Sequence, residues 1–177
     1  MARRRTVLVT ALIAAALALA GCGSSPAAGG PVSAPATPMN DPNLLHAADT
    51  VQPVLEKSFA DYYAGLALDH SRHVMIVYRR PDPALDAAVK SRAGGVAVDF
   101  RDAKYSLAEM QAVVRRVMAD RAYWARHGVS VQTAAPMVDG SSVRVGTTQG
   151  APAEAALFGK RYGAGAVTVE KAAPTLD

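Results

Sequence analysis

The sequence contains a single cysteine, Cys22, among its 177 residues. No disulfide can therefore form within the chain, and no metal site can be built from several cysteine ligands. No second thiol is left to act as a nucleophile. From the residues alone we expect neither a metal nor a cofactor.

The chain also has little surplus charge once its first residues are set aside. Of its 19 Lys and Arg residues, Arg3, Arg4 and Arg5 precede Cys22, which leaves 16 basic side chains against 15 acidic ones. Nucleic acids and anionic surfaces attract clustered positive charge. The nearly neutral remainder argues against nucleic acid as a partner and against an anionic surface as the main one.

Sequence motifs of catalysis are missing as well. There is no G-x-S-x-G and no H-E-x-x-H. His70 and His73 lie three residues apart with Asp69 alongside, but a metal needs three or four converging ligands, so we interpret them as solvated turn histidines. We predict a protein that is not an enzyme. A hydrolase with an unrecognised site stays open, because Ser-His-Asp triads assemble from distant residues.

The first residues have the composition of an export signal. Arg3 to Arg5 are followed by an apolar stretch of about 14 residues, Val7 to Ala20, which is short for a membrane span. Leu19, Ala20, Gly21 and Cys22 then resemble the lipobox of bacterial lipoproteins. The resemblance implies transfer of a lipid to the Cys22 sulfur and cleavage just before it. We therefore expect a lipid anchor on the outer face of the cell membrane, with the Sec or twin-arginine route left open.

After the cysteine, large apolar side chains are almost absent for 20 residues. The stretch is rich in Gly, Ser, Pro and Ala, which cannot bury enough surface to offset the entropy of ordering. We predict a signal peptide at 1–21, a lipidated and disordered tether at 22–42, one domain at 43–173 and a flexible tail at 174–177. A domain of about 130 residues can build a core of its own.

A long helix from Ser106 to His127 is the strongest structural signal. Ser106 and Glu109 form a capping box, and apolar side chains recur behind it at spacings of three and four. Val113 and Val117 lie on this stripe, as does Trp124, which we expect in a core rather than in an aromatic surface patch with Tyr105 and Tyr123. The paired arginines at 79–80 and 115–116 are interpreted as solvated faces.

The rest of the domain forms two similar series on either side of this helix. A helix from Leu44 to Tyr63 comes first, and Pro53 suggests a restart capped by Asp49 or Thr50. The first series comprises strands at 64–69 and 74–78, a helix at 83–92 and a strand at 96–101. The second comprises strands at 129–138 and 143–147, a helix at 152–162 and a strand at 166–170.

An offset of 69 positions aligns the two series from Val74 to Phe100 without a gap. Val74 then matches Val143, and Pro83 matches Pro152, which begins the second short helix. The sequence thus predicts an α+β fold of two strand–strand–helix–strand units, an internal duplication, packed around the long helix and preceded by an N-terminal helix.

Two stretches resemble a known family. Phe59 to Asp69 enters a strand that ends in Asp, and Val98 to Ser106 leads into a helix; both are similar to the pro-regions of secreted serine proteases of the alpha-lytic and streptogrisin type. The resemblance implies a module that assists the folding of a protease and then inhibits it. No protease domain follows before Asp177, so we expect any such action on a separate chain, and no active-site residue is carried over.

These observations favour a non-enzymatic domain that binds another extracytoplasmic protein, with a secreted serine protease as the partner that the resemblance suggests. The alternative is a structural or assembly lipoprotein of the cell envelope. An exposed strand edge or apolar patch would favour the binding module.

Overall fold

The computed structural model describes residues 40–173, all of which belong to one compact unit, residues 37–177. The predicted signal peptide, the lipidation site Cys22 with the lipobox residues Leu19, Ala20 and Gly21, nearly all of the tether and the tail lie outside the described residues. None of the described helices has the length and apolar character needed to cross a membrane.

The N-terminal helix, α1 (Pro42–Ser58), begins inside the predicted tether. The Asp41 carboxylate accepts hydrogen bonds from the N–H groups of Asn43 and Leu44 at 2.9 and 3.4 Å. The predicted restart near Asp49 is wrong, because the helix continues through Pro53. Pro53 has no N–H, so the Asp49 carbonyl one turn earlier lacks its helical donor. Asp49 and Pro53 are both exposed, so this carbonyl can accept a hydrogen bond from water.

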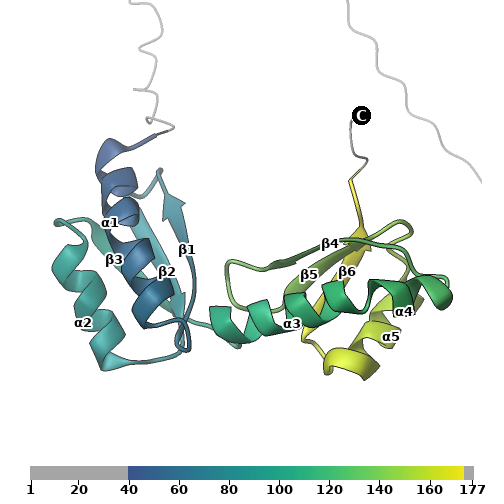
Figure 1. Cartoon of the computed structure of the whole chain (residues 1–177). Helices are drawn as coiled ribbons and strands as arrows, with labels where there is room; N and C mark the ends of the chain where they lie inside the picture. Colours follow the sequence, from purple (N-terminus) through teal and green to yellow (C-terminus); the bar gives the residue numbers. More distant parts are fainter. Residues whose placement is uncertain (1–39, 174–177) are drawn as a thin grey trace, which may run out of the picture. The chain divides into compact units, whose positions relative to one another are not determined.

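The first repeat is a three-stranded sheet covered by helices on one face (Figure 1). Strands β1 and β2 pair antiparallel, and the crossover helix α2 brings β3 parallel to β2. Its elements are β1 (Tyr63–Asp69), β2 (Val74–Arg79), α2 (Pro83–Arg92) and β3 (Ala97–Asp102). Helices α1 and α2 pack against Met75 and Val77 of β2 and form a mainly aliphatic core. The helices contribute Leu44, Ala47, Val51, Leu55, Leu85 and Val89 to this core.

The second repeat has the same strand order and the same helical cover. β4 and β5 are antiparallel, and β6 is parallel to β5. Its elements are α3 (Leu107–Ala119), α4 (Arg121–Arg126), β4 (Val131–Pro136), β5 (Val143–Thr147), α5 (Pro152–Tyr162) and β6 (Val167–Lys171). Its core includes three aromatic rings, and comprises Met110, Val117, Trp124, Val143, Val145, Phe158, Tyr162 and Val167 among others.

The predicted α+β class and the two strand–strand–helix–strand units are confirmed. The hairpins correspond at an offset of 68, however, and not 69. Tyr63 pairs with Arg79 and Val131 pairs with Thr147, and each hairpin has a bulge directly after that pair. The predicted match of Val74 with Val143 is therefore wrong, since a slip of one residue turns every side chain to the opposite face. The loop after β5 is one residue longer than the loop after β2, which restores the offset of 69 in α2 and α5.

The helix between the repeats is not continuous. Ser106 and Glu109 form the predicted capping box, but the helix breaks at Asp120, whose φ of −84° and ψ of 6° leave helical values. The Asp120 carboxylate is held by α5, where it accepts from Arg161 at 2.7 Å and from the Tyr162 hydroxyl at 2.8 Å. This contact explains the break that sequence periodicity cannot detect.

The two repeats contact each other through the bulge of β1. Its extra residue, Ala64, is 3% exposed and packs into the core of the second repeat. The neighbouring Gly65 lies against the backbone of Val138, so that a Cβ at Gly65 would overlap the Val138 carbonyl oxygen. The Tyr105 N–H donates to the Gly140 carbonyl at 2.9 Å. At the start of α3, Leu107 packs against the first core while Val117 is fully buried in the second.

Candidate functional site

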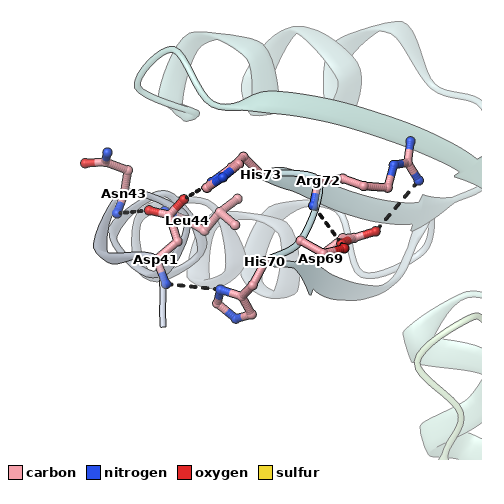
Figure 2. Close-up of polar contacts among 8 residues, drawn as sticks. Asp41, Asn43, Leu44, Asp69, His70, Arg72 and His73 are labelled. Carbon is pink, nitrogen blue, oxygen red and sulfur yellow. Dashed lines mark hydrogen bonds and ion pairs between the residues drawn. The ribbon is translucent and has the colours of Figure 1, made fainter. Parts of the chain in front are cut away.

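The hairpin histidines lie at the start of α1 (Figure 2). His70 Nδ1 accepts from the Asp41 N–H at 3.1 Å, and His73 Nδ1 lies 2.7 Å from Asp41 Oδ2. Asp69 accepts from the Arg72 N–H and from the Ser71 hydroxyl at 3.0 and 2.6 Å. The prediction of solvated turn histidines is thus wrong in part, because both imidazoles bind the cap of a helix 29 or more residues away.

This cluster holds the hairpin against the helix. The hydrogen bond from His73, together with the backbone N–H groups of Asn43 and Leu44, lowers the pKa of the Asp41 carboxyl. Nδ1 of His70 acts as an acceptor and so carries no proton in this arrangement. Within residues 40–173, no group of three or more His, Cys, Asp or Glu side chains is placed to hold a metal ion. The geometry is that of a structural clamp.

One of the paired arginines is not solvated. Arg79 ends β2 with 9% of its surface exposed. Its guanidinium donates to Asp86 at 2.9 Å, with Asp102 at 2.5 Å on the other side, and the hydrogen bond to Asp86 is the main reason that the pKa of Arg79 is raised. The prediction of a solvated face fails here because two carboxylates from α2 and β3 compensate the buried charge.

The aromatic residues divide between core and surface. Trp124 is 2% exposed and stacks on Phe158 with ring centroids 4.2 Å apart. Its Nε1–H donates to the Tyr162 hydroxyl at 2.8 Å, which satisfies the polar end of the buried ring. Tyr105 and Tyr123 are half-buried and pack against the same core. These rings therefore stabilise the second repeat.

The best candidate for binding is the outer edge of β3. This strand pairs with β2 on one side only. The Ala103 N–H donates to the Arg79 carbonyl, and because backbone groups alternate along a strand, the N–H and C=O groups of Val98, Phe100 and Asp102 point away from β2. None of these groups has a described backbone partner beyond the edge. They can accept an additional strand.

A groove lies along this edge beside α2. It has a volume of about 380 Å³ and is lined by Lys90, Ala93, Gly95, Val96, Val98 and Phe100. Val98 and Phe100 face the helices but remain only half-buried, because no further strand covers them. An extended peptide paired with β3 would direct alternate side chains into this groove, while Lys90, which lies near the Phe100 ring, would favour an acidic neighbour.

The corresponding place in the second repeat is built differently. Tyr162 stands where the first repeat has Ala93, 69 positions earlier, and its ring belongs to the second core. Val167 and Val169 replace Val98 and Phe100, and Val167 is 7% exposed. The sequence predicts β3 and β6, but it does not show that each lies at the edge of its sheet. The small side chain at Ala93, where the second repeat has Tyr162, is the one signal that could have indicated the groove.

Searches of protein-family models and of curated proteins return no match for this chain.

Proposed function

We propose that this protein is a lipid-anchored, non-enzymatic binding module that captures a segment of another extracytoplasmic protein at the β3 edge. One observation carries this proposal: the outward backbone groups of β3 run beside a groove that the side chains of Val98 and Phe100 help to line. Main-chain hydrogen bonds would supply affinity, and the groove would select alternate side chains. This mode needs no catalytic group.

The partner class we propose is a secreted serine protease, with the domain acting as an inhibitor or a folding assistant. The support is the likeness of residues 59–69 and 98–106 to protease pro-regions. The second stretch begins at Val98, the first of the three outward-facing residues of the candidate edge. A chymotrypsin-like bacterial protease is therefore the first partner to test.

The anchor is tested separately from the binding site. Cys22→Ala removes the sulfur that the lipobox would acylate, so the variant should leave the membrane fraction or accumulate as an uncleaved precursor. Processing and sedimentation as in the unmodified chain would contradict the anchor and leave the β3 proposal standing.

The edge is tested with a proline that removes one outward N–H. Val98→Pro keeps every hydrogen bond to β2, because prolines are tolerated on edge strands where the N–H faces away. The matched control is Val167→Pro on β6, where the N–H also points outward since Ala172 is the residue that donates to Thr147.

Partner binding is measured with residues 37–177 as bait in an envelope extract, and protease binding by inhibition of purified proteases. In both assays Val98→Pro should lower the affinity for the partner at least tenfold. Val167→Pro should retain it. Equal binding by both variants, at matched melting temperatures, would contradict the proposed edge.

A further inference from the structure

The near-neutral composition conceals a separation of charge between the repeats. The helices of the second repeat carry six Lys and Arg residues, whereas α1 and α2 of the first carry three. Five of the six, which we call the basic face, have no ion pair with a described residue and are exposed. The basic face comprises Arg115, Arg116, Arg121, Arg126 and Lys160.

The acidic side chains of these helices do not balance this charge, because each is already engaged. Glu109 pairs with Arg80 of the first repeat at 2.8 Å. Asp120 pairs with Arg161 at 2.7 Å. Glu154 is 5% exposed and accepts from the Thr147 hydroxyl at 2.5 Å. The five exposed cations are therefore left without an acidic partner from these helices.

Apolar and aromatic groups lie beside Lys160 and the ion-paired Arg161. A groove of about 400 Å³ between α4 and α5 is lined by Tyr123, Trp124, His127, Leu157, Lys160 and Arg161. Leu157 is 42% exposed, and the Arg161 guanidinium lies 4.0 Å from the Tyr123 ring centroid. Arg116 reaches the same helix, where it donates to the Arg161 carbonyl. Cations around an exposed leucine and a tyrosine are the composition of a surface that lies on a bilayer.

We infer that the basic face is a second membrane contact, which binds anionic phospholipid headgroups while Leu157 enters the headgroup region. This inference rests on the proposed lipid anchor, because the anchor supplies the bilayer. Cys22 lies only 20 positions before the start of α1, so an anchored chain holds the domain within reach of the bilayer. The domain is thereby kept at a high local concentration of headgroups, so that weak contacts suffice.

A membrane fits these observations better than an acidic protein segment. The cations come from three helices rather than from one strand or loop, as suits many mobile phosphates. The groove itself holds a histidine and two basic side chains rather than a deep apolar pocket. With the second repeat against the bilayer, the β3 edge belongs to the other repeat and stays available for a protein partner.

The test uses residues 37–177, which form one compact unit and lack Cys22. The fragment is sedimented with vesicles of phosphatidylcholine alone and of phosphatidylcholine with phosphatidylglycerol, at low and at physiological salt. We expect binding to the anionic vesicles only, weakened by salt. Each Lys or Arg near an anionic surface contributes about fivefold to the partition coefficient. The double variant Arg126→Gln with Lys160→Gln should therefore lower it about 30-fold.

The matched control is Lys57→Gln with Arg92→Gln, which also removes one Lys and one Arg from the last turns of two helices, here in the first repeat. It should bind within twofold of the unmodified fragment, as should Val98→Pro. The absence of anionic vesicle binding, or equal losses in the two double variants, would overturn the inference. Binding to polyglutamate without binding to vesicles would also overturn it and assign the face to an acidic protein. Because the fragment carries no lipid, these outcomes do not depend on processing at Cys22.

Discussion

The two repeats have one backbone plan and two different interiors. Both hairpins have the bulge at the same place, and both crossover helices begin at a proline. The first core is mainly aliphatic around Leu85 and Val89. In the second, the equivalent positions hold Glu154 and Phe158, and the core contains hydrogen-bonded aromatic rings. The turn residues and the alternation of side chains along the strands therefore determine the backbone arrangement, and different sets of core side chains are compatible with it.

The shared bulge shows how equivalent positions acquire different uses. In β1 the extra residue is Ala64, which is buried in the core of the other repeat. In β4 it is Gln132, which is exposed and bonds Ser130 and Thr148. A bulge redirects a side chain whatever lies beyond it. In the first repeat it joins the two halves, and in the second it faces solvent.

The largest expected effect compares the two cores at equivalent positions. Val89 and Phe158 are both 0% exposed and lie 69 positions apart in α2 and α5. Phe158→Ala removes a stacked ring and should lower the free energy of unfolding by about 4 kcal/mol, whereas Val89→Ala should cost about 2 kcal/mol. Urea denaturation of both variants measures the difference. Equal costs would contradict the larger contribution assigned to the stacked Phe158 ring.

The next effect separates the contact between the repeats from the cores. A methyl group at Gly65 would overlap the Val138 carbonyl, so Gly65→Ala should cost about 2 kcal/mol through overpacking. Its counterpart at an offset of 68 is Thr133, which is exposed, and Thr133→Ala should cost under about 0.5 kcal/mol. A harmless Gly65→Ala in thermal unfolding would show that the repeats are not in contact at this point.

The smallest effect is a pH dependence that comes from the ion pair between Asp120 and Arg161 in the second repeat. Hydrogen bonds from Arg161 and Tyr162 lower the pKa of the Asp120 carboxyl. A carboxyl whose pKa is lower in the folded state contributes stability above its unfolded pKa of about 3.9, and this contribution is lost as the pH falls through the folded value. Asp120→Asn should therefore cost about 1 kcal/mol at pH 7 and much less at pH 2.5.

Urea unfolding at the two pH values measures this difference. The control is Asp49→Asn on α1, since Asp49 is exposed and has no described ion pair. Its cost should be near zero at both pH values. A loss for Asp120→Asn that did not depend on pH would contradict the assigned ion pair.

Features that depend on local sequence could be predicted. The capping box at Ser106, the proline starts of α2 and α5 and the β-hairpins all follow from residues a few positions apart. The class of the fold followed from their order. The continuity of α1 through Pro53 could not be predicted, because it depends on which face of the helix meets water.

Features that depend on distant residues were missed. The break at Asp120 requires Arg161 and Tyr162, which lie more than 40 positions away. The burial of Arg79 requires Asp102 in a neighbouring strand. Likewise, the net charge of the chain does not reveal that the carboxylates of Glu109 and Asp120 are already paired with Arg80 and Arg161. The candidate edge was missed for the same reason, since strand order is a property of the assembled sheet.

The most direct test of the account is amide hydrogen exchange of the complex with a captured partner. The outward N–H groups of Val98, Phe100 and Asp102 face no described strand in the free protein, so they should exchange quickly and become strongly protected once a partner strand binds. The amides of Val167, Val169 and Lys171 on β6 provide the internal control and should be unchanged. Protection that appears on β6 instead, or unchanged exchange along β3 in a saturated complex, would contradict the claim that the first repeat binds its partner by adding a strand.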